Sequence, residues 1–133
     1  MTKILVVEDD ISNREMLTRR LEWEGYQVVT AENGAQAIVR AIEEQPNLIL
    51  MDMGLPVMNG WQATHRIKST SATHKIPIIA LTAFALSSDR EKCLRIGCDD
   101  YETKPVDFAR LNGKMRALLA NHQSADVAGL PTA

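Results

Sequence analysis

The chain has 133 residues, of which 45% are hydrophobic and 24% are charged, a composition typical of one globular domain rather than of a disordered, collagen-like or disulfide-scaffold protein. Fifteen lysines and arginines against 17 aspartates and glutamates give a formal net charge of −2, and no basic run could neutralise several phosphates, so direct nucleic-acid binding is not expected. Cys93 and Cys98 match neither a four-ligand zinc pattern nor a disulfide framework and are expected to be free thiols.

The chain opens with a short apolar run at residues 4–7. This run is too short for the central region of a signal peptide, and three acidic residues follow it at once. No stretch of the sequence is long and apolar enough to span a membrane. A cytoplasmic protein without a membrane partner is therefore expected.

Five strands are predicted along the chain. Four of them are apolar runs without polar alternation, which is typical of strands covered on both faces. These four runs lie within residues 4–7, 26–31, 48–51 and 76–81, and a weaker fifth strand is expected at 99–103.

Helical spacing of apolar residues occupies the segments between the strands. The clearest stripe runs through residues 108–119, and residues 35–42 repeat the spacing before Pro46, which a helix interior does not tolerate. Residues 16–21 form a weaker version before Gly25. The segments between the strands are therefore predicted to be helices.

Residues with capping chemistry mark the expected helix ends. Ser12 and Glu15 have the spacing of a reciprocal capping box, and Gly25 and Gly97 suit the left-handed position that follows many helices. The Asn33-Gly34 pair is a candidate hairpin turn, but the residues after it repeat with a period near 3.6. A helix start is therefore favoured there.

Alternating strands and helices predict an α/β fold in which helices cover both faces of a parallel sheet. One domain is expected over residues 1–121. Residues 122–133 are small and polar and include Gly129 and Pro131, which predicts a flexible C-terminal tail.

Polar residues follow four of the five expected strands, at the ends where open parallel sheets bind ligands. They are Glu8, Asp9 and Asp10 after the first strand, Asp52 after the third, Thr82 after the fourth, and Lys104-Pro105 after the fifth. We expect these side chains to converge on one site.

Carboxylates that meet in a partly dry cleft repel each other by several kcal/mol unless a cation lies between them. Hard oxygen ligands of this kind favour Mg²⁺, and Lys104 would supply a fixed positive charge. Asp52 between a metal and an ammonium suits a carboxylate that attacks phosphorus and then carries a phosphoryl group. Thr82 would offer a hydroxyl donor to that group.

Each of these residues also has an ordinary structural interpretation. Asp10 is more simply explained as a helix cap. Asp52 could be a cap as well, although a carboxylate on a buried rim facing Glu8 and Asp9 is favoured. Lys104 alone would be read as a solvated lysine, and Thr82 alone as a satisfied strand-end hydroxyl. The combination of residues carries the prediction.

Five segments follow one another in a characteristic order and spacing. They are Ile4 to Asp10, Leu48 to Pro56, Met58-Asn59-Gly60, Ala80 to Ala83, and Tyr101 to Pro105. Over about residues 3–120 they resemble the receiver domain of two-component response regulators, the CheY-like family. This resemblance implies a flavodoxin-like (βα)5 fold with five parallel strands in the order 2-1-3-4-5.

The resemblance also implies a role for each site residue. Asp52 would accept a phosphoryl group from a phosphohistidine, with Mg²⁺ bound by Asp9, Asp52 and the backbone carbonyl of Gly54. Glu8 stands where many relatives have an aspartate and would act on the metal through a water molecule. Thr82 and Lys104 would bind the phosphoryl oxygens.

The resemblance further implies a switch. Tyr101 would be an aromatic residue that turns inward as Thr82 moves toward the phosphate, and the Lys104–Pro105 peptide bond would be cis. Phosphorylation would change partner binding through the face formed by the fourth helix, the fifth strand and the fifth helix.

The expected protein is a single-domain response regulator in a phosphorelay. Its partners would be a sensor histidine kinase or a histidine phosphotransfer protein and an unknown downstream protein, and it would be a monomer or a phosphorylation-dependent homodimer. It would catalyse only its own phosphorylation and dephosphorylation. One alternative is a receiver module cut from a hybrid histidine kinase or a longer regulator. Another is an FMN-binding electron carrier, which the acidic residues after the first strand disfavour.

Overall fold

The computed structural model describes residues 1–83 and 87–129. Strands and helices alternate along these residues, as the sequence predicts. In chain order they are β1 (Lys3–Val7), α1 (Ile11–Trp23), β2 (Gln27–Ala31), α2 (Gly34–Glu44), β3 (Leu48–Asp52), α3 (Gly60–Lys68), β4 (Ile78–Thr82), α4 (Ser87–Arg95), β5 (Asp100–Thr103) and α5 (Phe108–Gly129).

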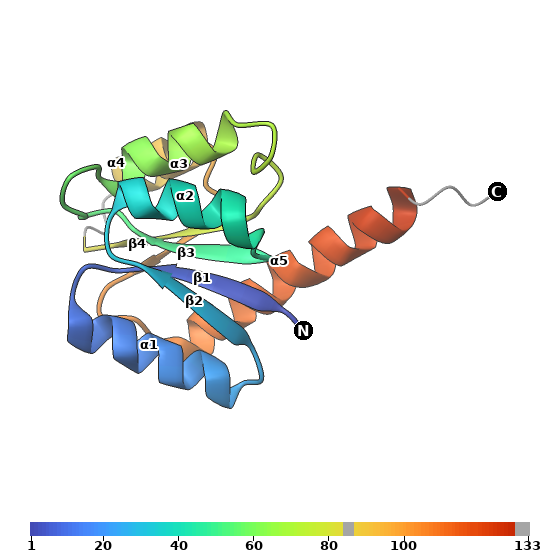
Figure 1. Ribbon diagram of the computed structural model, residues 1–133, viewed down its shortest axis with the longest axis horizontal. Helices are drawn as coiled ribbons and strands as arrows, with labels where there is room; N and C mark the ends of the chain where they lie inside the picture. The colour runs from blue at the N-terminus through green and yellow to red at the C-terminus, as the bar shows by residue number, and fades with distance from the viewer. Residues whose placement is uncertain (84–86, 130–133) are drawn as a thin grey trace.

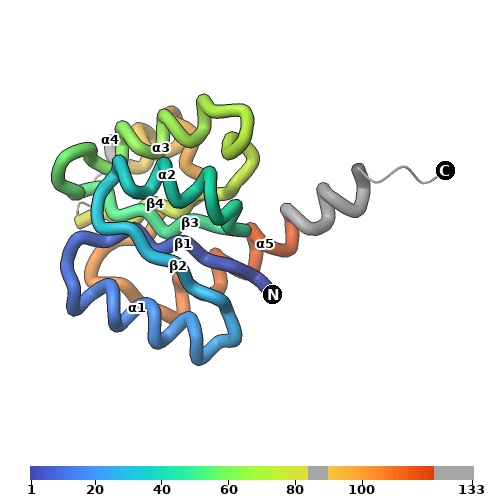
Figure 2. The backbone as a smooth tube through the Cα atoms, viewed as in Figure 1, coloured from blue at the N-terminus to red at the C-terminus, as the bar shows by residue number. Residues whose placement is uncertain are grey.

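The five strands form one parallel sheet in the order β2-β1-β3-β4-β5, which confirms the order implied by the resemblance. Because all the strands run the same way, their carboxyl ends meet at one edge. That edge lies on the left in Figure 2, where the chain leaves β1 for α1 and leaves β3 for α3. The polar residues predicted to converge follow the strands at this edge.

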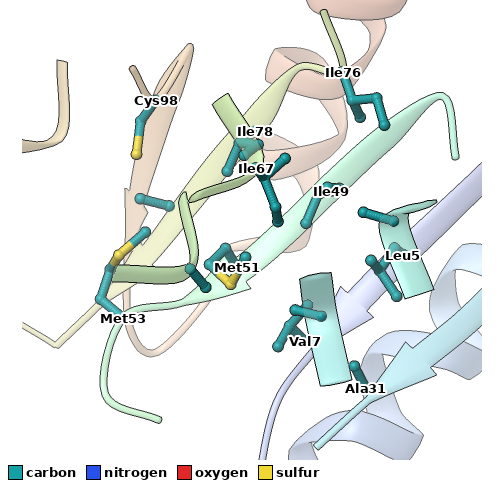
Figure 3. Packing of buried hydrophobic residues seen from close by; sticks show 14 of the residues in the cluster. Leu5, Val7, Ala31, Ile49, Met51, Met53, Ile67, Ile76, Ile78 and Cys98 are labelled. Atoms are coloured by element: carbon teal, nitrogen blue, oxygen red, sulfur yellow. The ribbon is translucent and has the colours of Figure 1, made fainter. Parts of the chain in front are cut away.

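Helices cover both faces of the sheet (Figure 1), so the apolar core is divided into two clusters. On one face, α2, α3 and α4 pack against alternate strand residues such as Leu5, Ile49 and Met51 (Figure 3). On the other, α1 and α5 pack against the intervening residues, such as Leu48 and Leu50. The central strands β1, β3 and β4 are therefore buried on both sides, as their unbroken apolar runs predict.

The edge strand β2 is less buried than its apolar run suggests. Gln27 is exposed and residues 28–30 are half-buried, so only Ala31 is enclosed. Val29 and Val28 nevertheless pack against the core clusters on opposite faces of the sheet, so the strand is covered on both faces, as predicted, but less completely than the central strands. Its position at the edge of the sheet, which the run of residues alone does not reveal, explains the difference.

The helix starts follow short polar side chains. Asp10 is the N-cap of α1, and its carboxylate accepts the backbone N–H of Asn13 at 2.9 Å, which confirms its interpretation as a cap. The predicted capping box at Ser12 was wrong, because Asp10 caps the helix two residues earlier and Ser12 lies within the first turn. Asn33 caps α2 in the same way, so the Asn33-Gly34 pair begins a helix, as predicted.

Two glycines and one proline have the backbone geometry expected of them. Gly25 and Gly97 have φ of 94° and 106°, values that a side chain would strain. The Lys104–Pro105 peptide bond is cis.

Helix α5 extends to Gly129, whereas the sequence analysis predicts a loose tail from residue 122. The physical reason is that neither glycine nor proline occurs between residues 122 and 128, so nothing in that stretch ends a helix. The division into a domain of 1–121 and a tail stays a prediction. Among the described residues, no helix is long and apolar enough to cross a membrane.

The two cysteines are buried thiols that form no disulfide, as predicted, and they lie in the core cluster on the face covered by α4. Burial, with a smaller contribution from the neighbouring Cys93, raises the pKa of the Cys98 thiol to about 12. Cys98 is therefore an uncharged part of the core at neutral pH.

Candidate functional site

A cleft of about 380 Å³ lies at the carboxyl edge of the sheet. Six of the predicted site residues line it, and they come from the ends of four different strands or the turns after them. These residues are Glu8, Asp9, Asp52, Gly54, Thr82 and Lys104. The fold thus brings together residues that are up to 96 positions apart in the sequence.

Lys104 lies between two carboxylates. Its Nζ atom is 3.1 Å from Glu8 Oε2 and 3.1 Å from Asp52 Oδ2. Both carboxylates are buried, with Glu8 1% and Asp52 5% exposed, so water screens neither of them well. A single ammonium therefore neutralises at most one of two buried negative charges.

The pKa values at this site show the imbalance. Burial and the nearby charge of Asp52 raise the pKa of Glu8 above its usual 4.5, and the contacts with Lys104 only partly oppose this. Burial tends to lower the pKa of Lys104, but its hydrogen bond to Glu8 and the charges of Asp52 and Glu8 outweigh burial and raise it. Lys104 is thus held firmly in its charged form, while Glu8 resists ionisation.

The carboxylates of Glu8, Asp9 and Asp52 offer three oxygen atoms that all lie within 4.8 Å of one another. Two of these groups are buried and Asp9 is exposed, so the cluster is open on one side. Carboxylate oxygens close together, with room for water, are the donor set that Mg²⁺ takes in proteins. The residues present therefore fit a hydrated divalent cation, which would also relieve the repulsion that Lys104 leaves uncompensated.

Local hydrogen bonds hold the side chain of Asp52 and the backbone of Glu8. The backbone N–H of Gly54 donates to Asp52 Oδ1 at 3.0 Å, and the guanidinium of Arg14 donates to the backbone carbonyl of Glu8 at 2.9 Å. Asp10 lines the cleft, but its side chain caps α1 rather than joining the three carboxylates.

Two glycines let the loop between β3 and α3 lie close to its neighbours, a feature that sequence reasoning missed. A Cβ atom on Gly60 would lie 2.3 Å from the backbone oxygen of Asp52, and one on Gly34 would lie 2.2 Å from that of Met58. Gly34 N–H also donates to Met58 at 3.0 Å. The available signal was a repeated Asn-Gly pair, because Asn33 and Asn59 each cap the helix that the glycine begins.

The two predicted switch residues are placed differently. Thr82 is buried, lines the cleft and ends β4. Tyr101 is half-buried on β5 and does not line the cleft. Instead, two cations approach its ring, Lys114 with its Nζ 5.1 Å from the ring centroid and Arg90 at 5.8 Å.

Trp61, in the first turn of α3, also lines the cleft, and the sequence analysis does not assign it to the site. A tryptophan at a helical position usually packs against the protein or keeps its polar edge in water, and less often forms part of a docking face. Trp61 reaches the cleft because the first turn of α3 lies beside the end of β3, a placement that the sequence pattern does not predict.

Comparisons with known proteins agree with this geometry. Residues 4–116 match the family model of the response regulator receiver domain. The protein PilH of Pseudomonas aeruginosa is 39% identical over 120 residues, which cover 90% of this chain and 99% of PilH. The probable transcriptional regulator ycf27 of Cyanophora paradoxa is 41% identical, over 88% of this chain and 48% of ycf27.

A solved structure is similar as well. It is the receiver domain of the sensor histidine kinase PA1611 from Pseudomonas aeruginosa, with a magnesium ion coordinated in the active site cleft. The sequence identity is 39%, the TM-score is 0.83, and the match covers 90% of this chain and 98% of that one.

Proposed function

The chain belongs to the family of response regulator receiver domains, and we propose that Asp52 accepts a phosphoryl group from a phosphohistidine. One observation carries this proposal: Lys104 lies 3.1 Å from both Asp52 and Glu8, beside a third carboxylate, Asp9. Such a site is anionic until a cation enters, and it holds one carboxylate next to a fixed ammonium. Receiver domains act with histidine kinases and downstream targets, so the donor is a sensor kinase or a histidine phosphotransfer protein.

In the proposed reaction, a carboxylate oxygen of Asp52 attacks phosphorus, and the phosphorus–nitrogen bond of the donor histidine breaks. The electron pair of that bond leaves with the imidazole, and the new bond makes an acyl phosphate on Asp52. The Gly54 N–H holds one carboxylate oxygen of Asp52 in place during attack. Lys104 and the hydroxyl of Thr82 bind the phosphoryl oxygens.

We assign the metal site to Glu8, Asp9, Asp52 and the backbone carbonyl of Gly54, with Glu8 acting through a water molecule. When bound there, Mg²⁺ would neutralise charge on the transferring group. The contribution of the protein is positioning and charge balance, so the domain catalyses only its own phosphorylation and its own dephosphorylation.

The consequence of phosphorylation is proposed to be a change in partner binding. Thr82 would move toward the phosphoryl group and Tyr101 would turn inward, which changes the surface formed by α4, β5 and α5. A downstream protein would bind that surface, and two phosphorylated copies could pair through it.

Incubation with acetyl phosphate and Mg²⁺ tests the proposal. Intact mass spectrometry should show one added phosphoryl group on the wild type and none on Asp52→Asn. Asp10→Asn is a matched control, since it changes a carboxylate that lines the same cleft but caps α1, and it should still be labelled. Equal labelling of the wild type and Asp52→Asn would overturn the assignment of Asp52.

The metal assignment has its own test. Chelation of Mg²⁺ should abolish labelling of the wild type, and added Mg²⁺ should restore it. Labelling that persists in chelator would contradict the metal site while leaving Asp52 as the acceptor.

Of the two alternatives, the electron carrier is excluded and the module of a longer protein remains. Family membership contradicts the interpretation as an FMN-binding electron carrier, and the acidic cluster after β1 would repel a flavin phosphate. The chain as a module of a longer protein stays an alternative, because its relatives include both PilH, matched over 99% of its length, and ycf27, matched over 48%. The cytoplasmic location and the lack of direct nucleic-acid binding stay predictions.

A further inference from the structure

We propose that Trp61 and Lys92 couple the state of the cleft to the position of α4. This inference rests on the proposed function, because the change in state is phosphorylation of Asp52. Trp61 is a positioning residue in this scheme, and Lys92 acts on the cleft through it.

Trp61 has contacts on two sides. It lines the cleft together with Asp52, Gly54 and Thr82, and it packs against the apolar cluster under α2, α3 and α4. An indole held in this way forms part of the cleft wall that a phosphoryl group would meet. The state of the cleft therefore bears directly on the placement of Trp61.

Lys92 connects this indole to α4. Its Nζ atom lies 4.3 Å from the centroid of the Trp61 ring, well within the range of a cation–π contact. Two residues earlier on the same helix, Arg90 faces the ring of Tyr101. Two cations of α4 are thus placed over two aromatic rings, one beside the cleft and one on β5.

The contact with Lys92 depends on the position of the Trp61 ring, which lies in the wall of the cleft. A phosphoryl group and its cation change both the space and the charge beside the ring. A shift of the ring away from Lys92 would release that helix. If the contact is lost on phosphorylation, then by linkage removal of Lys92 should favour the phosphorylated state by the free energy of that contact.

The first experiment follows the indole itself. The chain has two tryptophans, and Trp23 is 89% exposed, so Trp23→Phe leaves Trp61 as the one emitting tryptophan without disturbing the core. Titration with beryllofluoride and Mg²⁺, a stable mimic of an acyl phosphate, should change the emission of Trp61. The same titration of Trp23→Phe/Asp52→Asn should leave it unchanged.

The second experiment tests Lys92. Lys92→Met should lower the concentration of beryllofluoride that half-saturates the chain by about two- to fivefold, because an exposed cation–π contact is worth about 0.5–1 kcal/mol and 1.4 kcal/mol is tenfold. Lys92→Arg keeps the cation and should restore the wild-type value. Lys75→Met removes another exposed lysine and should change nothing.

The outcomes separate the two proposals. If mass spectrometry shows no phosphoryl group on Asp52, the proposed function fails. If Asp52 is labelled but the emission of Trp61 does not respond, or Lys92→Met binds beryllofluoride like Lys75→Met, the coupling is overturned alone. Lys92 is on the surface, and circular dichroism should show that both lysine variants keep the wild-type fold.

Discussion

Two clusters of buried charge lie on this sheet, and they have opposite compositions. At the cleft, one lysine, Lys104, lies between two buried carboxylates. On β5 and α5, one buried carboxylate, Glu102, lies between two cations, with Lys114 at 3.0 Å and Arg110 at 3.3 Å. Glu102 is 2% exposed, about as enclosed as Glu8.

The difference shows how a binding site can be told from a structural ion-pair network. The Glu102 cluster supplies the cations for its own buried charge, and Lys114 also bonds the backbone carbonyl of Tyr101 and approaches Asp100. The cleft has more negative charge than Lys104 can neutralise, and Asp9 adds to it. An added cation therefore has a role at the cleft and none at Glu102.

The largest effect is expected for Lys104→Met. In chelator this variant should lose about 3 kcal/mol of unfolding free energy, because Glu8 and Asp52 are then buried together without a cation. Mg²⁺ should reduce the difference in unfolding free energy between this variant and the wild type, since it supplies positive charge to the same carboxylates. Urea unfolding followed by circular dichroism, with and without Mg²⁺, measures both. If Mg²⁺ leaves that difference in unfolding free energy unchanged, the metal does not enter this cluster.

Lys114→Met is the matched change at the second cluster and should cost about 1–2 kcal/mol. The loss is smaller because Arg110 remains next to Glu102. Mg²⁺ should leave the gap between variant and wild type unchanged in the same urea experiment. A gap narrowed by Mg²⁺ here as well would remove the distinction between the two clusters.

The smallest effect, of opposite sign, is expected for Glu8→Gln. In chelator at neutral pH this variant should gain about 1 kcal/mol, because a neutral amide replaces a carboxylate whose ionised form is penalised by burial and by Asp52. Since the pKa of Glu8 is raised in the fold, the wild type takes up a proton there as the pH falls, and the advantage should shrink toward pH 4.5.

With Mg²⁺ bound, the wild type should instead be more stable than Glu8→Gln. The variant lacks one carboxylate of the cluster, so Mg²⁺ should stabilise it less than it stabilises the wild type. Thermal unfolding across pH, with chelator and with Mg²⁺, provides the measurement. A pH-independent advantage would show that ionisation of Glu8 is not the cause.

Part of the cleft could be predicted because Glu8, Asp52 and Thr82 each directly follow an apolar run. Parallel strands bring their carboxyl ends to one edge, so Glu8, Asp52 and Thr82 had to lie near one another once the runs were assigned as parallel strands. Lys104 follows the weakest of the strands by pattern, and the resemblance to a family gave its place more clearly than periodicity did.

Contacts between helices could not be predicted in the same way. Lys92 over Trp61 and the cations around Tyr101 depend on how α3, α4 and α5 are rotated on the sheet. Short side chains with similar capping ability compete at helix starts, and at α1 the N-cap is Asp10 rather than Ser12. The pattern of apolar residues predicts which face of a helix is buried, but not which side chains of another element it contacts.

The division of the core between two faces has a consequence for β3. Its odd-numbered residues Ile49 and Met51 point to one helical layer, and Leu48 and Leu50 point to the other. Insertion of one residue early in this strand would exchange the two layers for every residue after it, Asp52 included. Length changes in the loops distant from the cleft carry no such penalty. Natural and designed insertions should therefore accumulate at the amino-terminal edge of the sheet and leave the spacing from Leu48 to Asp52 unaltered.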